Sequence, residues 1–288
     1  MELRIENLTK IFHGTEAVSH LSCTMETGIY GLLGANGAGK TTLMRMLCTL
    51  LEPTEGGIYL NGEDIFRMGA AYRRVLGYLP QDFGFYPDFT VKDYLMYIAS
   101  IKGLPRAAAL KRVKHMIDQV GLSKEQDRKM KRLSGGMKRR AGIAQAVLNQ
   151  PDILILDEPT AGLDPNERVR FRNLISELAQ DRLVLLSTHI VSDIEFVADE
   201  ILFMKDGKLL HTGTPDEVIA GMEVRVWSLT VPVHEASAYE ARYKVTNRKA
   251  VSGGILLRML AEERPHPEAE EESAVLEDVF LSYSDGKE

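Results

Sequence analysis

The sequence predicts an α/β fold: a largely parallel sheet flanked by helices, interrupted by an all-helical insert and followed by a small C-terminal α+β domain. Three observations predict it. Short apolar runs alternate with amphipathic helical stretches through the first two-thirds of the 288 residues, as in a sheet covered on both faces. Apolar residues recur at helical spacing across residues 91–120. After about residue 221 strand-like and helix-like pieces are mixed.

The composition is that of an ordinary globular protein. Of the residues, 44% are hydrophobic and 26% are charged, which excludes collagen-like and disordered classes. The net charge of −6 gives no overall attraction to nucleic acid or an anionic membrane surface. The N-terminus is charged from its second residue, and no apolar run approaches the roughly 18 to 20 residues of a membrane span. We therefore expect a cytoplasmic protein, with Cys23 and Cys48 reduced, buried and inert.

Buried strands are predicted at residues 75–79, 153–156 and 183–187, because these apolar runs show no polar alternation. A helical subdomain is expected at about residues 82–133, with two helices separated by the breaker at 103–105. We assign residues 1–221 to the main domain and residues 222–288 to a small accessory domain.

Turn and cap signals organise the segment that joins the two domains. Asp206 and Gly207 separate two apolar runs and predict a two-residue hairpin. Thr214, Pro215 and Glu217 then predict a capped helix start, with the helix ending near residue 221. The acidic, proline-containing stretch 261–272 is interpreted as a solvated loop.

The phosphate loop (residues 34–41) carries the clearest chemistry. It follows an apolar segment and precedes a helix-like one, which is the context that this motif requires. Its glycines let successive backbone N–H groups converge on phosphate oxygens. Lys40 is expected to neutralise the β- and γ-phosphates, and Thr41 to ligate Mg²⁺ through its hydroxyl.

Two carboxylates, Asp157 and Glu158, end the run 153–156. The carboxyl edge of a parallel sheet is where such folds bind ligands. We assign Asp157 to Mg²⁺ and Glu158 to the attacking water. Alone, such a charged pair is more often a solvated loop end; the phosphate loop favours the catalytic interpretation.

A second anion site is predicted at the signature loop (residues 133–137). Ser134, Gly135 and Gly136 offer a hydroxyl and exposed N–H groups where a helix begins. Because one nucleotide does not need both loops, this site would serve the nucleotide of a second copy. The alternative is a serine-glycine turn that only caps a helix.

Together these motifs resemble the nucleotide-binding subunit of an ATP-binding cassette (ABC) transporter, with similar motif order and spacing across residues 1 to about 220. The resemblance implies a P-loop NTPase (ABC ATPase) core with an antiparallel β portion near the N-terminus and an α-helical insert. It implies hydrolysis of ATP with Mg²⁺. Met137, where the family usually has glutamine, and the following Lys138, Arg139 and Arg140 resemble the branch that exports drugs, antibiotics, polysaccharides or lipids.

The resemblance also assigns residue roles. Phe12 resembles the aromatic that stacks on adenine, and Gln81 the glutamine that touches Mg²⁺ and water. His189 resembles the histidine that contacts the γ-phosphate, and Asp164 the residue at the dimer seam. In other contexts Phe12 would be an ordinary strand-end aromatic, Gln81 a surface glutamine and His189 a structural histidine. The catalytic set implied is Glu158, His189 and Gln81; the Mg²⁺ set is Thr41, Gln81 and Asp157; the nucleotide set is Phe12, Gly34, Asn36, Gly37, Ala38, Gly39, Lys40, Thr41, Thr42, Ser134, Gly135, Gly136 and Asp164.

The implied partners are a second copy of the chain and an integral membrane permease on a separate chain, at the cytoplasmic face of the membrane. A soluble ABC ATPase of translation or DNA maintenance is the alternative, as is a regulatory protein without productive turnover. The basic run between Arg128 and Arg140 lacks interleaved aromatics. It is interpreted as a solvated or nucleotide-facing surface, and no nucleic acid partner is expected.

Overall fold

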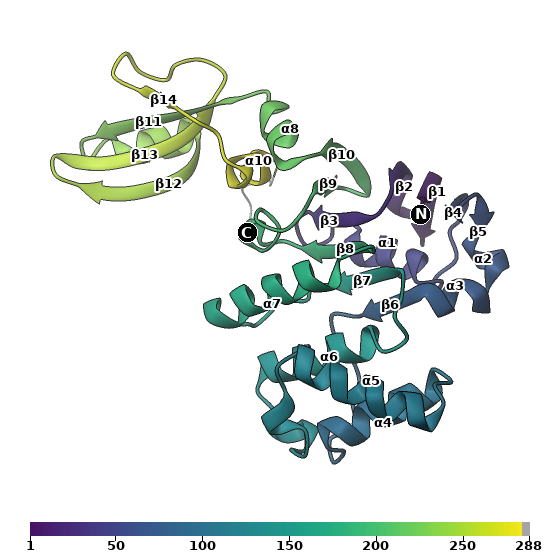
Figure 1. Cartoon of the computed structure of the whole chain (residues 1–288). Helices are drawn as coiled ribbons and strands as arrows, with labels where there is room; N and C mark the ends of the chain where they lie inside the picture. Colours follow the sequence, from purple (N-terminus) through teal and green to yellow (C-terminus); the bar gives the residue numbers. More distant parts are fainter. Residues whose placement is uncertain (284–288) are drawn as a thin grey trace. The chain divides into compact units, whose positions relative to one another are not determined.

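The structure is a computed structural model that describes residues 1–283 (Figure 1). The chain divides into two compact units between Leu210 and His211. The sequence puts its domain boundary eleven residues later, at 221. In the part that the structure describes, every helix is too short or too polar to cross a lipid bilayer.

The N-terminal sheet of the first unit is antiparallel, which confirms the antiparallel β portion. Its strand order is β2-β1-β4-β5. The strands are β1 (Leu3–Phe12), β2 (Thr15–Met25), β4 (Glu55–Leu60) and β5 (Glu63–Asp64).

The second sheet of this unit has the order β10-β9-β3-β8-β7-β6, and its members from β9 to β6 are parallel. The strands are β3 (Gly28–Leu33), β6 (Leu76–Leu79), β7 (Ile153–Asp157), β8 (Leu183–Thr188), β9 (Glu200–Lys205) and β10 (Lys208–Gly213). The three predicted strands are confirmed, except that Val75 ends a helix. Because β3, β7 and β8 are adjacent and parallel, their carboxyl ends meet at one edge.

Helices and the apolar faces of both sheets form the core of the first unit. Buried side chains from β1, β2, β3 and β7 pack with those of the helix that follows β3. The elements outside the insert are α1 (Lys40–Leu47), α2 (Ile65–Met68), α3 (Ala70–Val75), α7 (Pro165–Leu178) and the 3₁₀ turn η3 (Val191–Asp193). Cys48 is buried in this core, whereas Cys23 is only half-buried; burial raises the pKa of Cys23 to about 12.

The helical insert follows edge strand β6 and is confirmed (Figure 1). The Thr90 hydroxyl caps its first helix by accepting from the Asp93 N–H at 3.1 Å. Residues 102–105 separate the first two helices, as predicted. The elements are α4 (Val91–Ile101), α5 (Arg106–Gln119), η1 (Ser123–Glu125), η2 (Met130–Arg132) and α6 (Gly135–Ala146).

Two connecting signals behave as the sequence predicts. Asp206 and Gly207 have φ of 48° and 78°, the left-handed pair of a tight hairpin turn. Thr214 and Glu217 form a reciprocal capping box at α8 (Pro215–Ala220), which ends before Gly221.

The second unit contains an antiparallel sheet of order β12-β13-β11-β14. Its elements are β11 (Arg225–Val231), α9 (Ala236–Arg242), β12 (Lys244–Val251), β13 (Gly254–Ala261), β14 (Glu270–Glu272) and α10 (Leu276–Tyr283). The prediction of a loop through residue 272 is wrong for its last residues. Ala269 is buried beside Trp227, and this anchor brings the three following glutamates into backbone pairing with residues 226–228.

A buried carboxylate ties α10 to this sheet. Asp278 is 2% exposed and lies 2.7 Å from the Arg258 Nη2 atom. It also accepts hydrogen bonds from the Thr246 hydroxyl at 3.2 Å and the Val275 N–H at 3.0 Å. Asp278 thereby links α10 to both β12 and β13.

Candidate active site

The phosphate loop lies between the carboxyl end of β3 and the first turn of α1. Gly39 has φ of 103°, and a Cβ atom there would stand 2.3 Å from the Ala17 carbonyl oxygen, so this position requires glycine. The Gly207 N–H donates to the Ala38 carbonyl at 3.0 Å. The β9–β10 hairpin turn therefore supports the loop from the side.

The Lys40 ammonium is held inside this loop. It is buried, and its Nζ donates to the carbonyls of Gly34 at 2.6 Å and Ala35 at 3.0 Å. Nζ lies 3.8 Å from Glu158 Oε1. Burial lowers the pKa of Lys40, and the carboxylates of Glu158 and Asp157 oppose that shift. A cation with few water contacts is thus available to a phosphate group.

Asp157 ends β7 with its carboxylate buried. Its Oδ1 atom accepts from the Ser187 hydroxyl at 2.7 Å and lies 3.5 Å from Thr41 Oγ1. Parallel strands β7 and β8 bring Asp157 and Ser187 level in register. Two oxygen ligand candidates, a hydroxyl and a carboxylate, therefore meet at the start of α1.

Glu158 has φ of 45°, a left-handed conformation that is uncommon for a non-glycine residue. The residue is 5% exposed. His189 Nδ1 lies 3.0 Å from each carboxylate oxygen, and its ring side chain is 41% exposed. Oε2 has no hydrogen-bond partner within residues 1–283. An acceptor with spare capacity therefore sits beneath a ring that reaches the surface.

Further residues that sequence reasoning missed fix this edge of the sheet. The Ser187 hydroxyl also accepts from the Glu158 N–H at 3.0 Å. The buried Asp193 accepts from the hydroxyls of Thr160 and Thr188, which joins the loop after Glu158 to the loop that holds His189. Their sequence signal is weak, because hydroxyl residues at strand ends are common in any fold.

The remaining predicted residues lie outside this cluster. Phe12 is partly exposed at the end of β1, with Lys10 Nζ 5.3 Å from its ring centroid. Gln81 is exposed directly after β6, at the start of the insert. Asp164 caps α7, where its carboxylate accepts from the Glu167 N–H at 3.0 Å. Asn36, Gly37 and Thr42 belong to the phosphate loop and α1.

Ser134 is exposed at the N-terminus of α6. Its hydroxyl accepts from the Met137 N–H at 3.2 Å. Gly135 leaves open space where a Cβ atom would be, and the Cβ of a residue replacing Gly136 would lie 2.8 Å from Glu167 Oε2. The helix N-terminus thus presents free N–H groups and one hydroxyl at the surface.

The expectation of a solvated or nucleotide-facing surface is wrong for Arg139 in the basic run. This residue is 8% exposed. Its guanidinium donates to the carbonyls of Pro80 at 3.2 Å, Gln81 at 2.6 Å and Glu158 at 2.9 Å. Burial lowers its pKa, but arginine keeps its charge. The sequence does not reveal this, because the three acceptors are backbone atoms brought in by tertiary packing.

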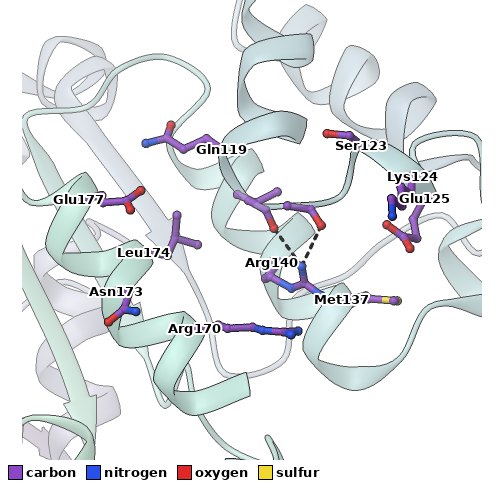
Figure 2. Close-up of a pocket in the computed structure, with 12 residues that line it drawn as sticks. Gln119, Ser123, Lys124, Glu125, Met137, Arg140, Arg170, Asn173, Leu174 and Glu177 are labelled. Carbon is purple, nitrogen blue, oxygen red and sulfur yellow. Dashed lines mark hydrogen bonds between the residues drawn. The ribbon is translucent and has the colours of Figure 1, made fainter. Parts of the chain in front are cut away.

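A separate open pocket of about 650 Å³ lies between the end of α5, α6 and α7 (Figure 2). Met137 and Arg140 line it from α6, and Arg140 Nη1 donates to the carbonyls of Val120 and Gly121. Its lining includes neither the phosphate loop nor Asp157 and Glu158. The pocket therefore borders the signature loop through Met137 and does not include the cluster around Lys40.

The donors present fit a nucleotide with Mg²⁺. Lys40 supplies a buried cation, while Thr41 and Asp157 supply hard oxygen ligands of the kind Mg²⁺ prefers. The described residues contain no group of three or more His, Cys, Asp or Glu side chains able to hold a metal ion. Few protein ligands are typical of Mg²⁺ that is bound together with phosphate oxygens.

Comparison with known proteins agrees with these motifs. The ABC transporter family model matches residues 18–161. An ABC transporter ATP-binding protein of Bacillus subtilis, YxlF, is 39% identical over 230 residues, which cover 80% of this chain and 76% of the relative. The bacitracin transport ATP-binding protein BcrA of Bacillus licheniformis is 40% identical over 212 residues, which cover 73% of this chain and 68% of the relative.

The fold is similarly matched. The structure of cbiO1 from Clostridium perfringens, part of the ABC transporter complex cbiONQ, superposes with a TM-score of 0.70 at 28% identity. The match covers 76% of this chain and 90% of cbiO1. The chain therefore belongs to the ABC transporter family, as an ATP-binding and ATP-hydrolysing subunit that powers a transporter.

Proposed function

We propose that two copies of this chain close head to tail on two Mg·ATP, and that this closure drives export through a permease on a separate chain. The bacitracin transport relative supports export. The solved neighbour is part of a multi-subunit transporter complex, which supports a separate permease and favours transport over translation or DNA maintenance. The working place of the chain is then the cytoplasmic face of the membrane.

Within one copy, Lys40 binds the β- and γ-phosphates, and Thr41 and Asp157 hold Mg²⁺ with help from Gln81. When bound, Mg²⁺ supplies charge neutralisation on the phosphate oxygens. The Gly34–Gly39 segment gives its backbone N–H groups to the same oxygens. The contact between Thr41 and Asp157 supports this division of roles.

Glu158 orients the attacking water and accepts its proton at the carboxylate. The place of this carboxylate beside Lys40 and the His189 ring supports that role. His189 stands between this carboxylate and the surface, where its second ring nitrogen can meet the γ-phosphate. Positioning and charge neutralisation supply most of the catalysis in phosphoryl transfer, which suits this set.

The signature loop serves the nucleotide of the other copy. Within one chain, Lys40 follows the inner strand β3, whereas Ser134 stands at the end of the insert that follows edge strand β6. Their separation in the topology supports a site shared between copies, with Phe12 against the base and Asp164 at the seam. The insert at about 82–133 carries the motion to the permease, and the C-terminal unit is an accessory domain.

The observation that carries the proposal is the cluster of Lys40, Asp157, Glu158 and His189 at one sheet edge. The test is a pull-down of tagged Glu158→Gln protein with Mg·ATP from detergent-solubilised membranes of its own host, followed by mass spectrometry. A stoichiometric polytopic membrane protein is expected. Ribosomal or DNA-associated partners without a membrane protein would overturn the transporter assignment for this chain.

A further inference from the structure

We infer that Arg139 is a positioning residue that fixes the Gln81 loop and the Glu158 backbone on the signature helix α6, and so couples the two halves of the shared site. The coupling rests on the proposed function. Its basis is one buried guanidinium with hydrogen bonds to three carbonyls, of Pro80, Gln81 and Glu158. These acceptors lie 59, 58 and 19 residues away in the chain.

The Glu158 end of this contact holds a strained backbone. A left-handed φ of 45° is unfavourable for a non-glycine residue. Such a conformation persists only where the surroundings determine it from several sides. Here the N–H donates to the Ser187 hydroxyl at 3.0 Å, and the carbonyl accepts from Arg139 at 2.9 Å and from the Ala161 N–H at 3.2 Å. Loss of the arginine leaves the carbonyl with the local Ala161 N–H alone and removes its tie to α6, so the carboxylate is less firmly placed beside Lys40.

The Gln81 end is held by two neighbouring positions of α6. Arg139 binds the Gln81 carbonyl, and Gly142, one turn further along, lies against Phe83. A Cβ atom at Gly142 would stand 3.0 Å from that ring and 2.7 Å from Leu79 Cδ1, so the close approach requires glycine. The segment from Leu79 to Phe83 is therefore clamped to one face of the helix.

The same helix presents Ser134 at its N-terminus, five residues before Arg139. A helix moves as a rigid element, so groups fixed to its first turns move with its end. A displacement of Gln81 or Glu158 in one copy would shift Ser134, which faces the nucleotide of the other copy under the proposed function. Arg139 is part of the same helix as Ser134 and donates hydrogen bonds to the carbonyls of Gln81 and Glu158. It therefore links these two residues to the helix.

The planar fork of arginine suits this task. Its five N–H donors point in fixed directions, so three carbonyls can be served at once. A lysine keeps the charge but is a flexible point donor. Arg139→Lys is therefore expected to keep the fold and lose part of the positioning, and Arg139→Gln to lose most of it.

The test compares Arg139→Gln and Arg139→Lys with a matched control, Arg112→Gln. Arg112 also donates to two carbonyls, Val147 at 2.9 Å and Leu148 at 3.2 Å, but at the opposite end of α6.

The measurements on the full chain are kcat for ATP, binding of a fluorescent ATP analogue, and thermal midpoint. Misplacement of reacting groups by about 1 Å can cost on the order of a hundredfold. We therefore expect kcat to fall on the order of a hundredfold in Arg139→Gln and by less in Arg139→Lys. Both variants should bind the ATP analogue like wild type, and the control Arg112→Gln should keep a near-normal kcat.

A second readout is the ATP-trapped dimer of Glu158→Gln, measured as molar mass by light scattering with Mg·ATP. Adding Arg139→Gln to that variant is expected to abolish the trap, and adding Arg112→Gln to leave it. Wild-type kcat and an intact trap with Arg139→Gln would overturn the inference. If Arg139→Gln does not fold, Arg139→Lys decides: wild-type kcat in that variant overturns the inference as well. Normal turnover by Glu158→Gln alone would instead contradict the proposed function.

Discussion

Replacing Glu158 with glutamine tests the chemistry of the site most directly, because the variant should lose stability without nucleotide and regain most of it with Mg·ATP. Glu158 Oε1 and Lys40 Nζ are 3.8 Å apart, and both side chains are buried. Removing one partner of a buried ion pair costs about 3–5 kcal/mol. Lys40 keeps its bonds to two carbonyls, so we expect the low end, about 3 kcal/mol.

In the absence of nucleotide this loss lowers the thermal midpoint by roughly 6–12 °C for a unit of this size, as scanning fluorimetry can measure. With Mg·ATP most of this loss is offset, because a neutral side chain does not repel the γ-phosphate and the nucleotide is not hydrolysed. ATP at a hundred times its Kd adds about 2.7 kcal/mol. Turnover should fall by about 10²- to 10⁴-fold, the usual contribution of a general base.

Glu177→Gln is the matched control, because it removes the same charge from an exposed position on α7. Its stability should stay within about 0.5 kcal/mol of wild type, with normal turnover. A Glu158→Gln protein that melts like the control without nucleotide and still turns over ATP would refute both the buried pair and the assigned role of the carboxylate.

Lys40→Ala should weaken ATP binding in a titration with a fluorescent analogue, and an unchanged curve would remove the lysine from the site. Mixing Ser134→Arg with Lys40→Ala chains should restore ATPase activity, since each mixed dimer keeps one intact shared site; continued inactivity argues against sharing. Asp278→Ala should destabilise the second unit by about 3 kcal/mol, seen as faster hydrogen exchange near Arg258, with unchanged turnover. Burial lowers the pKa of Lys102 to about 8, so between pH 8 and pH 10 its side chain binds more protons in the unfolded chain than in the folded one. The free energy of unfolding should therefore rise with pH in this range. Urea unfolding of Lys102→Met should lack this rise.

The sequence predicts those parts of the fold and site that depend on local chemistry. The apolar segment before the phosphate loop is a strand, β3, which is the context that the motif requires. The hairpin at Asp206 and Gly207 depends on two residues that tolerate positive φ. Asp157 and Glu158 could be placed at a sheet edge for the same reason. Each of these predictions uses neighbours in sequence.

What the sequence does not show depends on approach between distant segments. Arg139 belongs to a run of basic residues, and only packing of α6 against β6 turns it inward. The Glu270–Glu272 strand likewise depends on Ala269 entering a core formed by Trp227 and its neighbours. In both cases the residue type indicates a solvated surface, and the tertiary contact overrides it.

Ser134 shows how two interpretations that compete at the level of sequence can both hold. As a helix cap, its hydroxyl oxygen accepts one hydrogen bond, from the Met137 N–H. A hydroxyl carries one donor hydrogen besides its lone pairs, so the capped residue can still donate to a phosphate oxygen. The cap also orients that hydrogen and holds the free N–H groups of the first turn in place. Capping the helix and binding a phosphate are therefore compatible uses of the same side chain, and the first prepares the second.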